Sequence, residues 1–179
     1  MRIGLTSDHR GYKAKKFLKD SLYMHDVIDY GTDTEDSVDF PVYAKKLGIA
    51  LQNDEVDLGI AICGTGIGMS IVLNKMKGIY CAKISNINEA VLCREHNNAN
   101  VIALGANDVT PRKAYKIIKA YDSVVFETRH QIRLDKISNE LTPMVATARI
   151  IKKDHPDAQV VFIGPCASKK LEASRRTVR

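Results

Sequence analysis

Tryptophan is absent from the 179 residues of this sequence, and aromatic side chains make up only 6% of it. A surface that binds nucleic-acid bases by stacking needs such side chains, so a nucleic-acid partner is not expected. No apolar run approaches the roughly 18 residues of a membrane span, and the opening MRIGLTSDHRGYK lacks the apolar stretch of a signal peptide. We therefore expect a cytoplasmic protein without a membrane partner.

The four cysteines form no CxxC pair. Cys63, Cys81, Cys93 and Cys166 each lie in an apolar or glycine-rich context, which is typical of a reducing compartment rather than of a disulfide scaffold. Nor do the cysteines, histidines and acids show a recognisable zinc spacing, so the sequence predicts no metal site.

The net charge of +6 is unevenly distributed. The segment 141–179 contains eight lysines or arginines against three acids, so it carries most of the excess. The positive charge therefore says little about what the first 140 residues bind.

The first 138 residues alternate strand patterns with helix patterns. Strands are predicted at 2–7, 26–30, 57–62, 79–84 and 100–104, and helices at about 9–23, 41–52, 67–75, 86–96 and 111–121. This βαβ alternation builds a parallel sheet covered on both faces. We predict an α/β fold: a doubly wound, Rossmann-like, five-stranded parallel sheet with helices on both faces.

The end of the chain has a different pattern. Residues 129–137 predict an amphipathic helix with cations on one side, and a helix to about 153, a strand at 158–164 and a basic helix follow. This segment is too short for a core of its own. We predict a main domain at 1–138 and a C-terminal α/β extension at 139–179 that packs on it or on another subunit.

Ligands of open parallel sheets bind beyond the carboxyl ends of the strands. Cys63 follows the most apolar strand and precedes Gly64, Gly66 and Gly68, whose bare N–H groups favour a thiolate and suit a developing oxyanion. The alternative is a small buried cysteine beside a tight turn, but its position favours a functional role.

Two familiar interpretations of this glycine-rich loop fail. A dinucleotide fingerprint needs GxGxxG and an acid at the end of the next strand, whereas this loop is GTGIG and that strand contains Lys83. A P-loop needs Gly-Lys-Ser/Thr, and the lysine is missing.

Other polar residues are ambiguous when each is taken alone. Asp8 and His9 follow the first strand, where Asp8 also suits a helix N-cap, and His96 ends a helix whose terminus a histidine favours. Arg129 and Arg133 lie four residues apart and either clamp a phosphate or form a solvated basic face. Together they suggest a small anionic substrate surrounded by acid–base groups.

In this order, the segments SDHRGYKAKK, GTDTEDSVDFPVYA, EVDLGIAICGTGIGMSIVLNK, REHNNANVIALGA and FETRHQIRLDKI resemble the ribose-5-phosphate isomerase B family, which includes galactose-6-phosphate isomerase subunits. The resemblance covers residues 1–138. It implies a Rossmann-like domain that forms a homodimer or a dimer of dimers, with active sites at the subunit interface and no metal or organic cofactor.

The resemblance also implies roles for individual residues. Cys63 matches the base that moves a proton between C2 and C1 of the sugar, and His96 matches the residue that helps to open the furanose ring. Arg129 and Arg133 match phosphate ligands, as does His9, which is also a substrate-binding position. The remaining implied site residues are Thr65, a third catalytic residue within the glycine-rich loop, and the substrate contacts Asp8, Tyr43, Gly64, Gly66, Ile67, Gly68, Asn97 and Asn107.

The sequence departs from the family pattern at a few positions. Asn107 and Tyr80 replace two usual arginines, the first of which is an expected phosphate ligand, and Ile87-Asn88-Glu89 replaces a usual Pro-Tyr-Ser. The expected reaction is the interconversion of D-ribose 5-phosphate and D-ribulose 5-phosphate. Isomerisation of a six-carbon sugar phosphate (allose or galactose 6-phosphate) and a catalytically impaired sugar-phosphate-binding subunit are the alternatives.

The segment after residue 138 lies outside this family. TPMVATARIIKKDHPDAQVVFIGPCASKKLEA resembles a fragment of the catalytic domain of iron-only hydrogenases. It contains a single cysteine, Cys166, whereas an iron–sulfur cluster takes about four thiolates. We expect a packing or assembly role.

Overall fold

The computed structural model describes residues 1–139, so the predicted elements after residue 139 and Cys166 lie outside the described residues. The chain divides into two units, Met1–His130 and Gln131–Arg179. The second unit is described only through α6 (Gln131–Asn139).

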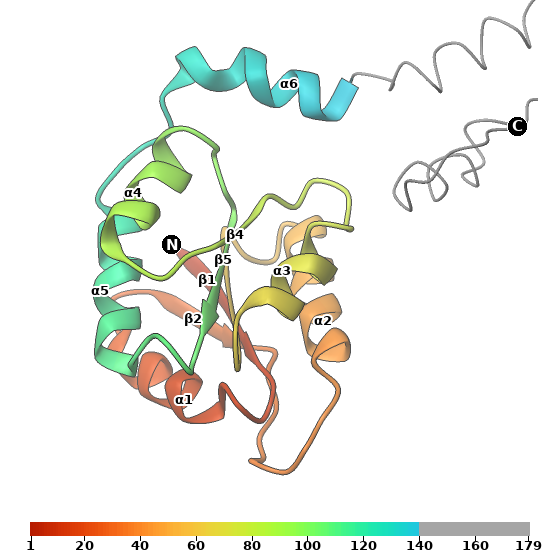
Figure 1. Cartoon of the computed structure of the whole chain (residues 1–179), viewed down its shortest axis with the longest axis vertical. Helices are drawn as coiled ribbons and strands as arrows, with labels where there is room; N and C mark the ends of the chain where they lie inside the picture. Colours follow the sequence, from red (N-terminus) through yellow and green to blue (C-terminus); the bar gives the residue numbers. More distant parts are fainter. Residues whose placement is uncertain (140–179) are drawn as a thin grey trace, which may run out of the picture. The chain divides into compact units, whose positions relative to one another are not determined.

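Five parallel strands form one sheet in the order β2-β1-β3-β5-β4 (Figure 1). The strands are β1 (Arg2–Ser7), β2 (Asp26–Asp29), β3 (Leu58–Cys63), β4 (Cys81–Lys83) and β5 (Val101–Gly105). All six residues of the central β3 are buried, which explains its uninterrupted apolar sequence, because a central strand of a parallel sheet is covered on both faces.

Helices cover both faces of this sheet (Figure 1). One face carries α1 (Tyr12–Ser21), α4 (Ile87–Glu95) and α5 (Pro111–Asp122), and the other carries α2 (Phe40–Gln52) and α3 (Ile67–Leu73). Ile60 and Ala61 of β3 point to opposite faces and belong to two separate apolar clusters. The predicted doubly wound α/β fold is confirmed.

Side-chain hydrogen bonds set some boundaries that differ from the prediction. α1 begins at Tyr12 instead of His9, because the Asp8 carboxylate accepts hydrogen bonds from the backbone N–H groups of Arg10 and Gly11 and holds them in a turn. β4 is shorter than predicted, and the Asn100 side chain binds the backbone just before it, accepting from Tyr80 N at 2.8 Å.

The cationic segment near the end of the first unit is also not one continuous helix. A 3₁₀ turn, Thr128–His130, comes first, and α6 begins at Gln131. None of the helices among residues 1–139 is long and apolar enough to cross a membrane.

The parallel arrangement gives the sheet two chemically different ends. Segments that follow strands, such as those after Ser7, Cys63 and Gly105, lie at what we call the carboxyl end. Segments that precede strands, such as 96–100 before β5, lie at the amino end. Any site residue therefore belongs to one end or the other.

Candidate functional site

Cys63 is the last residue of β3 and begins the glycine-rich loop at the carboxyl end. Its side chain is buried, and its Sγ accepts a hydrogen bond from Gly66 N at 3.1 Å. This contact fixes the position of the sulfur at the start of the loop. The N–H groups of Gly64 and Thr65 donate to no group of the described residues, so they are available to an oxyanion.

The loop keeps this shape because a glycine occupies its tightest position. Gly66 has φ +76°, in the left-handed region, and a Cβ there would lie 2.9 Å from the backbone carbon of Leu104. Thr65 is exposed, and its Oγ1 accepts a hydrogen bond from Ile67 N at 3.3 Å. A Cβ on Gly68 would lie 2.8 Å from the Phe40 ring, so α2 packs directly against the start of α3.

Asp8 and His9 lie beside this loop. Asp8 is buried, its N–H donates to the carbonyl of Ile62, and its carboxylate organises the turn before α1. The His9 Nδ1 accepts a hydrogen bond from Val38 N at 3.2 Å, which leaves the proton of the neutral ring on Nε2, as a donor. Both residues are thus fixed in orientation by the backbone around them.

Asn107 joins the same end of the sheet through the turn after β5. Its N–H donates to the carbonyl of Gly64 at 3.0 Å, and its side-chain Oδ1 accepts from the Arg10 guanidinium at 3.2 Å. Asn107 is therefore anchored to the glycine-rich loop and contacts an arginine from the turn before α1.

Tyr43 belongs to α2 and is only partly buried. Its backbone carbonyl accepts a hydrogen bond from the Thr6 hydroxyl, and the Lys46 ammonium lies 5.1 Å from the centre of its ring. The described contacts of Tyr43 fix α2 against β1.

His96 and Asn97 lie at the opposite, amino end. His96 is the C-cap of α4, where its N–H donates to the carbonyl of Leu92, and Asn97 is exposed. The next asparagine, Asn98, has φ +46° and accepts a hydrogen bond from the Arg94 guanidinium at 2.7 Å. The contact between Arg94 and Asn98 thus explains part of the polar sequence at the end of this helix.

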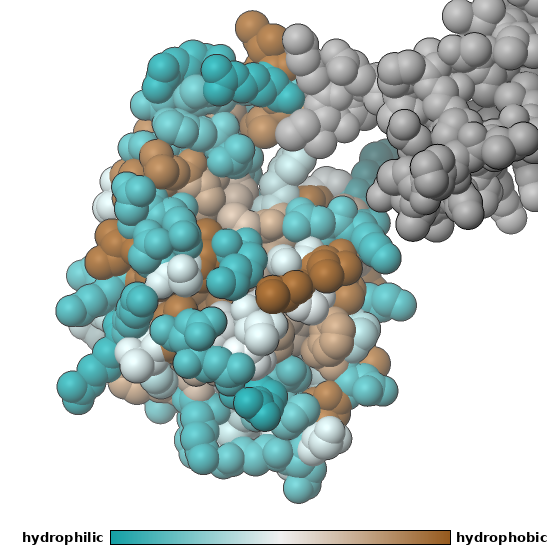
Figure 2. All heavy atoms as spheres, viewed as in Figure 1, coloured by the Kyte–Doolittle hydropathy of each residue, from teal (hydrophilic) through white to brown (hydrophobic). Residues whose placement is uncertain are grey.

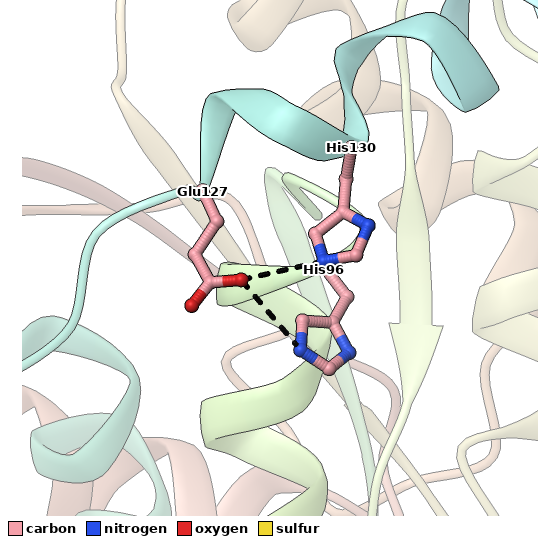
Figure 3. Close-up of side chains that lie close together, drawn as sticks. All are labelled: His96, Glu127 and His130. Carbon is pink, nitrogen blue, oxygen red and sulfur yellow. Dashed lines mark ion pairs between the residues drawn. The ribbon is translucent and has the colours of Figure 1, made fainter.

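Glu127 gathers the polar side chains around His96. Its backbone N–H donates to the carbonyl of Glu95 at 2.9 Å, which ties the 127–130 segment to the end of α4. Its Oε2 lies 4.0 Å from His96 Nε2 and 3.3 Å from His130 Nε2, and Figure 3 shows both rings directed at this carboxylate. The two imidazole rings themselves are 4.5 Å apart.

Arg129 binds the same carboxylate oxygen with two nitrogens. Its Nε donates to Glu127 Oε2 at 2.8 Å, and its Nη2 lies 2.6 Å from that oxygen. These contacts, and then the charges of Arg129, His96 and His130, hold the pKa of Glu127 below its ordinary value. Glu127 is therefore an anion at neutral pH, and the Arg129 guanidinium supplies the permanent positive charge beside it.

His96, Glu127 and His130 also offer ligand atoms that lie within 4.8 Å of one another. Two imidazoles and a carboxylate are ligand types that suit zinc. However, the Arg129 guanidinium already occupies the Glu127 oxygen, so an added cation there would face a fixed positive charge. The geometry favours an ionic network over a metal centre.

Arg133 lies on α6, in the second unit, and its side chain is exposed. Within α6 the neighbouring Gln131 donates a hydrogen bond to Asp135 at 2.9 Å.

The predicted site residues of the first unit therefore fall into two groups. Asp8, His9, the 63–68 loop and Asn107 meet at the carboxyl end, with Tyr43 on α2, whereas His96, Asn97 and Arg129 meet at the amino end. The strand β5 runs between the ends, and its five residues span about 13 Å at roughly 3.3 Å per residue. One copy of the chain does not bring its own His96 to its own Cys63.

Two polar residues in these groups were not identified from the sequence. Glu127 stands two positions before Arg129, and an acid so close to a predicted phosphate ligand was an available signal. Arg10 follows Asp8 and His9 directly, so the sequence also places it at the carboxyl end of a strand. Nothing in the spacing predicts its contact with Asn107.

The end of the chain has a likeness of its own. A model of the C-terminal domain of the iron-only hydrogenase large subunit matches residues 123–179. This segment contains one cysteine, Cys166, and so does not carry the ligands of an iron–sulfur cluster.

Most of the chain is similar to sugar-phosphate isomerases, and this match overlaps the hydrogenase match at residues 123–137. A model described as Ribose/Galactose Isomerase matches residues 3–137. Ribose-5-phosphate isomerase B of Escherichia coli (strain K12) is 38% identical over 144 residues, which cover 76% of this chain and 94% of that protein.

Solved structures agree with this match. Ribose-5-phosphate isomerase B of Clostridium thermocellum is 42% identical, with a TM-score of 0.74, over 76% of this chain and 95% of that one. The Mycoplasma genitalium enzyme with bound ribulose-5-phosphate is 37% identical, with a TM-score of 0.71, over 76% and 93%. The chain belongs to the ribose/galactose isomerase family.

Proposed function

We propose that the protein is an aldose–ketose isomerase that interconverts D-ribose 5-phosphate and D-ribulose 5-phosphate. The observation that carries this proposal is the position of the Cys63 sulfur. It accepts a hydrogen bond from Gly66 N, and the nearby N–H groups of Gly64 and Thr65 donate to no group among residues 1–139. A base next to an oxyanion site is what proton transfer alpha to a carbonyl requires. The relatives named for this reaction support the same substrate.

The reaction needs no co-reactant. The Cys63 thiolate removes the proton from C2 of the open-chain aldose, and the electron pair moves through C1 onto the carbonyl oxygen to give a cis-enediolate. The loop N–H groups stabilise the negative oxygen. The thiol then returns its proton to C1, and the C2 hydroxyl proton moves to the oxygen on C1, which leaves a ketone at C2 and a hydroxyl at C1.

The groups at the amino end supply the other two tasks. His96 exchanges protons with the ring oxygen and the C1 hydroxyl when the furanose opens, and the Arg129 guanidinium binds the phosphate. Holding the phosphate orients C1 and C2 over the sulfur, so remote binding energy is used at the reacting atoms.

Because these groups lie at the two ends of the sheet, we propose a homodimer in which each site takes its base from one copy and His96 and Arg129 from the other. Apolar side chains border the catalytic loop where that second copy would pack. Ile67 and Ile71 on α3 are more than half exposed, as is Val42 on α2. Figure 2 shows hydrophobic side chains gathered over this part of the surface. Burying them would stabilise the dimer.

The test is a coupled assay on ribose 5-phosphate, with allose and galactose 6-phosphates compared at equal concentration. We expect turnover on the five-carbon substrate, and a loss of about 10²-fold or more in kcat for Cys63→Ala. Cys81→Ala is the matched control, because burial raises the pKa of the Cys81 thiol to about 12 and keeps it protonated. If Cys63→Ala isomerises at the parental rate, Cys63 is not the base.

A further inference from the structure

Arg10 is a charged side chain at the carboxyl end that the proposed mechanism does not use. It belongs to the turn between β1 and α1, and its side chain is exposed. The buried Asp8 carboxylate accepts its backbone N–H at 2.9 Å, so the position of Arg10 is fixed by a neighbouring residue of the site.

The guanidinium of Arg10 lies over the catalytic loop. A Cβ built on Gly64 would be 3.5 Å from Arg10 Nε and 3.7 Å from Asn107 Nδ2, so both side chains contact the residue that follows Cys63. Arg10 Nη2 donates to Asn107 Oδ1 at 3.2 Å. Arg10 and Asn107 thus form a polar pair next to Gly64, which we call the Arg10–Asn107 pair.

Within residues 1–139, no ion pair neutralises the positive charge of the Arg10–Asn107 pair. The Asn107 amide is neutral, and no carboxylate of residues 1–139 forms an ion pair with Arg10. Elsewhere in the first unit, Arg2 pairs with Asp57 and Arg129 pairs with Glu127. A guanidinium has five N–H donors in a planar fork that suits a phosphate or carboxylate, and one bond to an amide leaves most of them free.

We propose that Arg10 binds the substrate phosphate and that Asn107 orients it. This inference rests on the proposed function, and it deepens the phosphate site by adding a ligand from the copy that supplies Cys63. The neutral asparagine holds the guanidinium by its oxygen without cancelling the charge. The arginine that the family pattern places at position 107 is thereby replaced by one reaching the same loop from position 10.

The test compares Arg10→Ala with the parent enzyme, using ribose 5-phosphate as substrate and inorganic phosphate as competitive inhibitor. Loss of a charge-assisted bidentate contact raises KM and the phosphate Ki by about 10- to 100-fold, while kcat changes by less than about threefold. Lys16→Ala, which removes an exposed positive charge from α1, is the matched control and leaves both constants unchanged.

A charge relocation completes the test. In the double variant Arg10→Ala with Asn107→Arg, the guanidinium approaches the loop from position 107. KM then recovers by about tenfold or more relative to Arg10→Ala alone. An Arg10→Ala enzyme whose KM and phosphate Ki stay within about twofold of the parent overturns the assignment of Arg10 but leaves the isomerase intact. A parent enzyme without turnover on ribose 5-phosphate overturns the proposed function itself.

Discussion

The division of site residues between the two ends of the sheet leads to a mixing experiment. Cys63→Ala and His96→Ala homodimers are each expected to be strongly impaired, because every site in them lacks one of the two groups. When equal amounts are dissociated together and reassociated, half of the dimers contain one copy of each variant.

The recovered activity follows from the geometry. In a mixed dimer, one site combines the intact Cys63 of one copy with the intact His96 of the other, and the second site lacks both. Half of the dimers with one of two sites restored gives about a quarter of the parental activity. If both groups came from the same copy, every site would stay defective and mixing would restore nothing.

The assay is the coupled rate on ribose 5-phosphate before and after mixing, with dimer exchange checked by native mass spectrometry. The matched control mixes Cys63→Ala with Asp8→Ala, whose residues both lie at the carboxyl end of one copy. That pair restores no activity, since each site of the mixed dimer still carries one defect. Equal recovery in both mixtures, or none in either despite proven exchange, would refute the shared site.

Two further predictions concern protonation and charge. At pH 8, iodoacetamide should label Cys63 at least about 100-fold faster than Cys93 or Cys81, because burial raises the thiol pKa of Cys93 to about 11 and that of Cys81 to about 12. The labelling rate of Cys93 should rise about tenfold per pH unit toward pH 11. Peptide mass spectrometry measures these rates, and equal rates for the three cysteines would contradict the prediction. Glu127→Gln frees the exposed Arg129 guanidinium and should lower the Ki of inorganic phosphate by about two- to fivefold, whereas a raised Ki would contradict the competition between this carboxylate and phosphate.

Periodicity predicted the fold because each strand carries a strong local signal. The β3 segment is apolar at every position, and Pro111 and Thr110 mark the start of α5, where Thr110 Oγ1 accepts from Lys113 N. The start of α1 and the length of β4 were missed because the side chains of Asp8 and Asn100 reorganise the backbone there. Each of these contacts is made by a single side chain, so it does not change the periodic pattern of apolar residues from which the elements are predicted.

The candidate site was predictable where backbone and side chain act within a few residues. Cys63 and its glycines share one loop, so their proximity follows from the chain itself. Arg10 meets Asn107 across 97 positions, and Glu127 meets His96 only because α5 returns the chain to the end of α4. Contacts of this length depend on tertiary packing, which spacing along a sequence does not encode.

The strand β5 separates thiol from imidazole, and this makes the proposed catalysis dependent on protein concentration. Dilution that dissociates the dimer would inactivate every site while each subunit stays folded. Specific activity measured across a dilution series would then report the dissociation constant of the assembly, without any label or separation step.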